Sequence, residues 1–159
     1  MKKINIQIKS IFGKVLFEYS KENNTLKETV EKFIIENNNI VKNVDLSNLD
    51  LSGINFDNSR FYNSSFDHSS FDHSSLNDIK IKKIAFFYGL YKYSVIAILS
   101  EEKEQFVIMG CFNRTRKEWE KDFWNNRSEF QNDGSIGSKL RVFAFETACK
   151  WLDLQKEIK

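Results

Sequence analysis

The segment from Asp133 to Lys139 has the composition of an anion-binding loop. It reads Asp-Gly-Ser-Ile-Gly-Ser-Lys and leads into a predicted helix that carries Arg141. Glycines let backbone N–H groups approach a ligand, and the first N–H groups of a helix are unpaired and lie at its positive end. The hydroxyls of Ser135 and Ser138 would add donors. These residues favour a phosphate or carboxylate ligand, but the spacing is not that of a P-loop, and an ordinary helix cap beside a glycine loop is the alternative.

A second basic cluster, Arg114, Arg116 and Lys117, lies at the start of another predicted helix. Thr115 and Glu118 have the spacing of a capping box, which marks that helix start. Cations oppose the macrodipole at a helix N-terminus by about 0.3–1 kcal/mol each. A ligand would account for them, and solvated surface charge is the alternative. Six residues are therefore assigned to ligand binding: Arg114, Arg116, Ser135, Ser138, Lys139 and Arg141.

The sequence shows no arrangement typical of catalysis. Both histidines, His68 and His73, lie inside a repeat, so none is available elsewhere as a base. Cys111 and Cys149 have no obvious histidine partner, and we expect two reduced, buried thiols. The carboxylates are scattered without a recognisable spacing. We predict a non-enzymatic protein that needs no cofactor, with an enzyme of unrecognised type as an alternative.

A strict five-residue period organises the middle of the chain. Large apolar residues recur at Leu46, Leu51, Phe56, Phe61, Phe66, Phe71 and Leu76. Two positions before each of them stand Val44, Leu49, Ile54, Ser59, Ser64, Ser69 and Ser74. A helix repeats every 3.6 residues and a strand every two, so this period fits neither. It indicates a solenoid, in which one short unit stacks on copies of itself.

These units resemble the pentapeptide-repeat family, whose unit is a small residue, Asp or Asn, then Leu or Phe, and two free positions. Seven consecutive units match, from Val44–Asn48 to Ser74–Asp78, although the first three begin with a bulky residue. The resemblance implies a right-handed, four-sided β-helix in which residues twenty apart stack, as Leu46 with Phe66 and Phe61 with Ile81. It also implies that His68 and His73 diverge by about a right angle, so no metal site is expected.

The repeat is acidic, and the rest of the chain is basic. Residues 44–78 hold six aspartates and one arginine, a balance of −5, whereas the whole chain has a net charge of +2. An acidic solenoid face is expected to bind a protein partner through Asp67, His68, Asp72 and His73. Some pentapeptide-repeat proteins resemble DNA and inhibit DNA gyrase, but fewer than two coils and a pI near 8.4 fit that role poorly. Direct nucleic-acid binding is not expected.

Three regions are predicted in a mostly β fold with helices. Residues 1–40 form a β-hairpin (strands near 4–8 and 15–19) and a helix at 26–37, which caps the solenoid at 41–83. Residues 84–159 form an α+β module with strands at 84–88, 93–99 and 105–112, a helix opened by Thr115, and a last helix at 138–154. That helix carries an apolar stripe expected to lie deep in a core, made of Leu140, Phe143, Ala144, Thr147, Ala148 and Trp151.

The C-terminal half also resembles a segment that accompanies pentapeptide repeats in uncharacterised bacteriophage and prophage proteins. The residues that carry this resemblance are Met109–Cys111, Glu118, Trp119, Glu129, Phe130, Asp133–Ser135, Ser138, Arg141, Ala144 and Phe145. The resemblance implies a phage-encoded accessory protein, and no chemistry comes with it.

We interpret the sequence as a non-enzymatic, phage-type binding protein, acting against host defence. In the first hypothesis the basic C-terminal module sequesters a phosphate-bearing small molecule such as a nucleotide signal. In the alternative the acidic solenoid face inhibits a host defence complex or a DNA-acting enzyme. A short solenoid leaves apolar ends and sheet edges, so a homo-oligomer is expected. The sequence has no apolar run that would span a membrane and no signal peptide, which favours the cytoplasm of the host bacterium.

Overall fold

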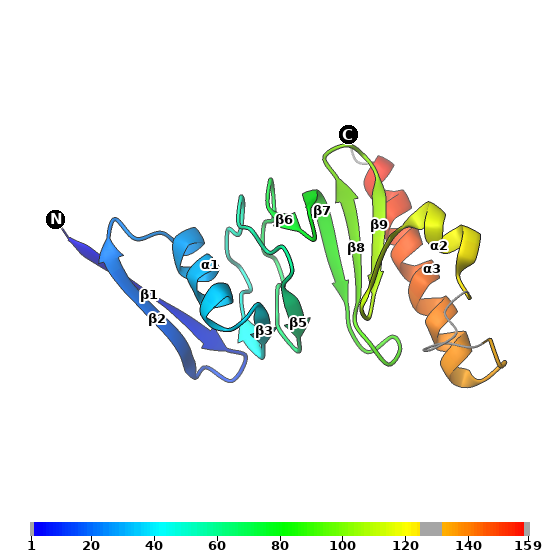
Figure 1. Cartoon of the computed structure of the whole chain (residues 1–159), viewed down its shortest axis with the longest axis horizontal. Coiled ribbons are helices and arrows are strands. Elements are labelled where there is room, and N and C mark those ends of the chain that lie inside the picture. Colours follow the sequence, from blue (N-terminus) through cyan, green and yellow to red (C-terminus); the bar gives the residue numbers. More distant parts are fainter. Residues whose placement is uncertain (1, 125–131, 158–159) are drawn as a thin grey trace. The chain divides into compact units, whose positions relative to one another are not determined.

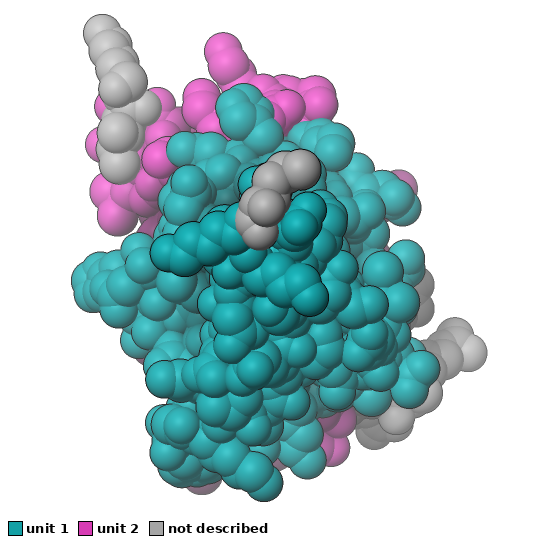
Figure 2. All heavy atoms as spheres, turned by 90° about the vertical axis from the view of Figure 1, so that its left-hand side faces the viewer, with its two compact units in different colours: residues 1–81 teal, residues 82–159 magenta. Residues whose placement is uncertain are grey.

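The computed structural model describes residues 2–124 and 132–157. The fold is mostly β, with three helices in this part of the chain. Two compact units are present, residues 1–81 and residues 82–159, which Figure 2 shows in two colours.

The first unit begins with a β-hairpin and a helix, where the sequence predicts them (Figure 1). Strands β1 (Lys3–Ser10) and β2 (Val15–Glu22) pair antiparallel, with Ile8 opposite Phe17. Helix α1 (Leu26–Glu36) buries an apolar side that includes Val30 and Phe33, and the rings of Phe33 and Phe17 lie 5.7 Å apart. The alternation in the strands and the 3.6-residue period in the helix thus produce one shared core.

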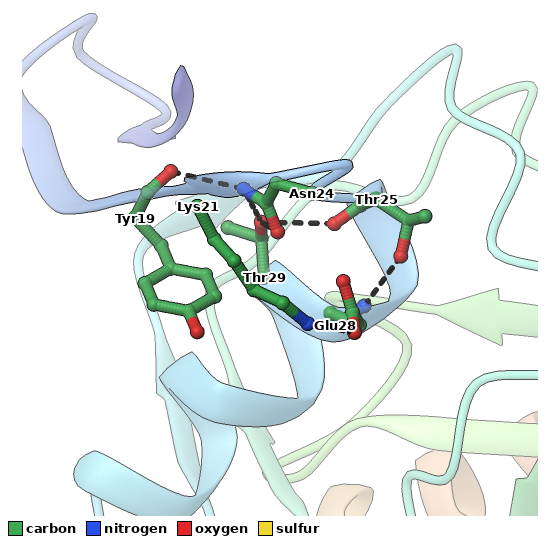
Figure 3. A network of polar contacts seen from close by, with 6 residues as sticks. All are labelled: Tyr19, Lys21, Asn24, Thr25, Glu28 and Thr29. Atoms are coloured by element: carbon green, nitrogen blue, oxygen red, sulfur yellow. Dashed lines mark hydrogen bonds and ion pairs between the residues drawn. The ribbon is translucent and has the colours of Figure 1, made fainter. Parts of the chain in front are cut away.

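A polar network fixes the start of α1 (Figure 3). The Thr25 hydroxyl accepts from the backbone N–H of Glu28, as an N-cap side chain does. The buried Asn24 amide donates to the Tyr19 carbonyl and to the Thr29 hydroxyl, at 3.0 Å each. Because every buried amide group that loses water must regain a partner, these bonds tie the β2 end to the first helical turn.

Strands β3 (Ile40–Lys42), β4 (Val44–Asp45), β5 (Arg60–Tyr62) and β6 (Ser75–Leu76) belong to a coil of twenty residues per turn. Strands β3 and β5 pair in parallel, with Ile40 opposite Arg60. Three isolated parallel bridges join Asp45 to Ser65, Asp50 to Ser70 and Asn55 to Ser75. All four pairings are twenty residues apart, which is the predicted stacking interval. They form four short parallel ladders, three of which consist of a single bridge. Strand β4 also pairs antiparallel with β1.

The large residue of each five-residue unit points into the coil. Leu46, Leu51, Phe56, Phe61, Phe66, Phe71 and Leu76 are all buried. Neighbouring rings touch edge to face or tilted, with centroids 5.0 Å apart for Phe61 and Phe66 and 5.8 Å apart for Phe56 and Phe71. Such pairs add about 0.5–1.5 kcal/mol beyond the area they bury. The predicted interior columns are therefore confirmed as buried.

The parallel coil ends at a tight reversal. Asn77 and Asp78 both have positive φ, 52° and 64°, as a two-residue type I′ hairpin turn requires. Strand β7 (Ile79–Phe87) then pairs antiparallel with β6, and the Ile81 backbone bonds to that of Ser74. Ile81 is buried, but residues 79–81 do not continue the parallel coil, as stacking on Phe61 would require.

The second unit is a sheet covered on one face by two helices (Figure 1). Its strands are β8 (Val95–Ser100), β9 (Gln105–Met109), β10 (Phe112–Thr115) and the end of β7, in the order β10-β9-β8-β7. Helices α2 (Arg116–Asp122) and α3 (Ile136–Glu157) pack on this sheet around a core that includes Trp119, Ala144 and Ala148. All six residues of the central strand β8 are buried.

The structure differs from the sequence interpretation in two places in this unit. The strand predicted over 105–112 is divided by a turn at Gly110, where φ is +61° and an added Cβ would lie 3.2 Å from the Tyr93 ring. The stripe assigned to the core of the last helix is also only half correct. Ala144 and Ala148 are buried, but Leu140 and Phe143 are 42 % and 53 % exposed.

Candidate functional site

The four sides of the coil differ in charge. Asp45 and Asp67 lie on the side of the Asp45–Ser65 bridge, Asp50 and Asp72 on the next, and Asp57 and Asp78 on the third. The fourth side, where β3 pairs with β5, carries Lys42 and Arg60. We call the first three the acidic sides and the fourth the basic side. The six aspartates of the repeat thus lie on three sides of the coil.

The carboxylates on the acidic sides are held in two ways. Asp45 and Asp50 accept hydrogen bonds from Ser47 and Ser52, which lower their pKa values. The Asp57 carboxylate accepts from the Asp78 backbone N–H and from the Ser75 hydroxyl. The side chains of Asp67 and Asp72 are exposed, and within the described residues neither takes part in a hydrogen bond or ion pair. These two carboxylates remain available to a partner.

His68 and His73 occupy a special backbone position. Eight residues spaced five apart have positive φ, between 47° and 68°: Asn43, Asn48, Gly53, Asn58, Asn63, His68, His73 and Asp78. Asn, Asp and His are several-fold enriched in this left-handed region among residues other than glycine. The histidines therefore stand at corners of the coil, where the backbone requires a residue of this kind. Their partner-binding role remains a prediction.

Inward-pointing serines join one coil to the next. The Ser64 hydroxyl donates to the Val41 carbonyl and accepts from the Val44 N–H, twenty residues earlier. Ser69 makes the same pair of bonds with Leu46 and Leu49. The first coil carries bulky side chains at this position and the second carries serine. Each serine hydroxyl thus provides hydrogen-bond partners for backbone N–H and C=O groups that the short ladders do not pair.

The candidate anion-binding loop is occupied by the chain's own carboxylate. Asp133 Oδ1 accepts from the Ser138 hydroxyl at 2.7 Å and from the Ser135 N–H at 2.9 Å. The Ser135 hydroxyl in turn accepts from the Ser138 N–H, which caps α3. The serine hydrogen bonds lower the pKa of Asp133 to about 2. The donors predicted for an external anion are brought together, but they already bind an internal one, and Lys139 points into solvent.

Arg141 lies in an aromatic enclosure. Its side chain is 0 % exposed, and the guanidinium carbon lies 4.8 Å from the Phe123 ring and 5.6 Å from the rings of Trp119 and Trp124. Arg114 approaches the same Trp119 ring at 4.9 Å. The structure thus brings the guanidinium groups of Arg114 and Arg141 to the same indole ring. Arg141 is buried there and does not contact solvent. A ligand in solution does not reach that guanidinium in this conformation.

Arg116 is held by carboxylates of two helices. Its Nε lies 2.7 Å from Glu120, and its Nη1 lies 2.5 Å from Asp153 and 3.2 Å from the Gln105 amide oxygen. The bond to Asp153 raises the pKa of Arg116 and lowers that of Asp153. A depression of about 690 Å³ surrounds this group. It is lined by four cations, Lys103, Arg116, Lys117 and Lys156, and four carboxylates, Glu102, Glu104, Glu120 and Asp153.

The six residues assigned to ligand binding therefore fall into three places. Ser135 and Ser138 lie at the start of α3, where Lys139 is exposed. Arg114 and Arg141 flank Trp119, and Arg116 lies in the depression. Sequence reasoning missed Asp133 as the internal acceptor, although its spacing to two serines is typical of a side-chain cap. It also missed Asp153, because no sequence pattern joins residues 37 apart.

Residues 42–78 match the family model for pentapeptide repeats, in eight copies. This segment is a pentapeptide-repeat segment. The eight left-handed corners fall within it, and the match covers less than half of the chain. No curated protein and no solved structure matches the chain.

Among residues 2–124 and 132–157, no three His, Cys, Asp or Glu side chains cluster as ligands of a metal ion would. In the same ranges no helix is long and apolar enough to cross a membrane.

Proposed function

We propose that the protein acts by binding another protein through the acidic sides of its pentapeptide-repeat segment. The observation that carries this proposal is the charge arrangement: three sides carry carboxylates and the fourth carries cations. A partner with a basic surface would be oriented as well as attracted, because the basic side repels it. A non-enzymatic interaction role is also typical of pentapeptide-repeat proteins.

The construction of the acidic sides supports this role. All six acids of residues 44–78 are aspartates, whose short side chains have less rotamer freedom to lose than glutamate or lysine. The backbone beneath them is fixed by the twenty-residue ladders and by the serine hydrogen bonds. A surface that is already ordered loses less entropy when it binds, which leaves more of the interaction energy as affinity. Asp67 and Asp72 are the contacts we assign first.

The hairpin and α1 are bonded to the first coil of the repeat. The Glu31 carboxylate accepts from the Asn55 backbone N–H at 3.0 Å, so α1 is joined to the first coil. We assign α1 the role of cap for that end of the segment. Because the C-terminal half resembles segments of phage proteins, we propose that the partner is a host protein in the cytoplasm, either a defence complex or a DNA-acting enzyme.

A pull-down from bacterial lysate tests the proposal with a matched control. Asp67→Lys/Asp72→Lys reverses the two exposed carboxylates, and Glu22→Lys/Glu102→Lys makes the same change in net charge at exposed positions outside the repeat. We expect one defined protein to be recovered by the wild type and by the control, and lost with the first variant. Equal recovery by all three would show that the acidic sides are not the binding surface.

A phosphate-bearing small molecule remains a second candidate, at the depression around Arg116. Its size and its three lysines favour this ligand, but the geometry supports it less well, because the carboxylates equal the cations in number and two of them already bind Arg116. Thermal denaturation with a panel of nucleotides and cyclic nucleotides is the measurement. Stabilisation that Lys117→Ala removes would support the site, and no stabilisation by any of them would exclude it.

A further inference from the structure

Helix α3 presents a second apolar surface that lies mostly outside the core. Ile136, Leu140, Phe143 and Leu154 are 75 %, 42 %, 53 % and 58 % exposed. With Thr147 and the half-buried Trp151 they follow the three- and four-residue spacing of one helix face. The buried residues Arg141, Ala144, Ala148 and Leu152 lie on a different face, which packs on the sheet (Figure 1). A stripe of this length on a single helix is typical of a surface that binds another helix.

The charges beside the stripe indicate what that other helix is. Lys139, Glu146, Lys150 and Glu157 follow one edge of the stripe and are all exposed. In the part of the chain that the structure describes, none of these four side chains takes part in a hydrogen bond or ion pair. Their signs run positive, negative, positive, negative. If a second copy of the helix runs in the opposite direction, each positive charge in this order lies opposite a negative one.

An antiparallel second copy satisfies both the stripe and the charges. With Thr147 opposite its own copy, Leu140 meets Leu154 of the second copy and Phe143 meets Trp151. On the charged edge Glu146 then faces Lys150 of the second copy, and Lys139 faces Glu157. In an antiparallel helix pair the same edge of each helix meets across the interface, so these pairs are geometrically allowed. In a parallel pair the charged edge would instead face the opposite edge of the second helix, so these four charges would not pair with one another.

We propose that the protein forms a homodimer through antiparallel packing of α3 against α3 of a second copy. This surface belongs to the second unit, whereas the acidic sides of the repeat belong to the first. One pair of helices buries less than the ~1,600 Å² of a standard interface, so we expect a dissociation constant of about micromolar order. The oligomer expected from the sequence is thereby assigned to α3 and not to the open ends of the solenoid.

Sedimentation velocity of the full chain over a range of concentrations tests the surface. The wild type should be a concentration-dependent dimer, and Phe143→Glu should raise the dissociation constant about tenfold or more, because it places a charge in the stripe. Phe12→Glu is the control, since Phe12 is 81 % exposed in the β1–β2 turn and should leave the dimer unchanged. Circular dichroism shows whether each variant is folded. A folded wild type that stays monomeric throughout the range would overturn the proposal.

Two further variants test the antiparallel order. Glu146→Lys should weaken the dimer by placing lysines opposite each other, and Glu146→Lys/Lys150→Glu should restore it by exchanging the signs. In a Cys111→Ser background, Leu140→Cys and Leu154→Cys proteins should form a mixed disulfide when combined and little disulfide alone, because the bond requires Cα atoms within about 7 Å. Disulfide formation by Leu140→Cys alone, or no rescue by the double exchange, would contradict the arrangement.

Discussion

At the scale of single residues, the coil depends on a left-handed backbone at every fifth position. This conformation costs most side chains about 1–2 kcal/mol, because the Cβ approaches the following carbonyl oxygen. Asn, Gly, His and Asp fill all eight positions from Asn43 to Asp78. The repeated Asp-His pairs therefore have a conformational reason that is independent of any ligand.

Substitution at one corner tests this conformational role. His68→Val places a β-branched side chain where φ is 59°, so the free energy of unfolding should fall by about 1–2 kcal/mol. His68→Asn should leave it nearly unchanged. Urea unfolding followed by circular dichroism is the measurement. Asp67→Val, at a neighbouring position without positive φ, is the control, and an equal loss in both valine variants would contradict the account.

The Asp133 cap makes a prediction about pH. The pKa of Asp133 in the folded chain, about 2, is below its ordinary value of 3.8. A carboxyl with a depressed pKa stabilises the fold above its unfolded pKa, and that contribution is lost as the pH falls towards the folded value. Stability should therefore decrease between about pH 4 and pH 2, and Asp133→Asn should flatten this part of the profile. An identical pH profile in the variant would rule out the cap as its source.

At the scale of elements, one tryptophan joins the strands and helices of the second unit. Trp119 of α2 is fully buried, and its indole N–H donates to the Val107 carbonyl of β9 at 2.7 Å. The ion pair of Arg116 with Asp153 joins α2 to α3 as well, but it is partly exposed and contributes less than about 1 kcal/mol. Burial and the single hydrogen bond of Trp119 therefore dominate this junction.

Replacement of Trp119 measures that junction. Trp119→Phe keeps an aromatic ring but removes the donor and leaves a buried carbonyl without its partner, so the free energy of unfolding should fall by about 1–3 kcal/mol. Trp151→Phe is the matched control, because Trp151 borders the same core and is only half-buried. Denaturant unfolding of both variants provides the comparison. A loss no larger than that of the control would show that the hydrogen bond is not important.

Sequence patterns predicted the elements better than their contacts. The five-residue period follows from local spacing, and so do the starts of all three helices to within two residues. The twenty-residue stacking followed from the resemblance to pentapeptide repeats. Contacts such as Arg116 with Asp153 were not predictable, because they join residues 37 apart. The burial of Arg141 had a signal that was not used: it lies three and seven residues before Ala144 and Ala148, on their helix face.

At the scale of the whole molecule, the chain combines an acidic repeat with flanking segments that are basic overall. Residues 44–78 carry a balance of −5 within a chain whose net charge is +2. Attraction of a basic partner to the acidic sides is electrostatic, so it should weaken with salt as the Debye length falls from about 10 Å at 0.1 M to 3 Å at 1 M. Binding of the recovered partner at both salt concentrations checks this, and a salt-independent affinity would contradict it.

The most direct test of the account is the affinity of that partner for charge-reversed protein. Isothermal titration of the wild type, Asp67→Lys/Asp72→Lys and Glu22→Lys/Glu102→Lys compares the two exposed carboxylates with a control of equal net charge. The account predicts that the first variant binds at least about tenfold more weakly, or 1.4 kcal/mol, and that the control binds as the wild type does. Equal affinity for the wild type and Asp67→Lys/Asp72→Lys would contradict it.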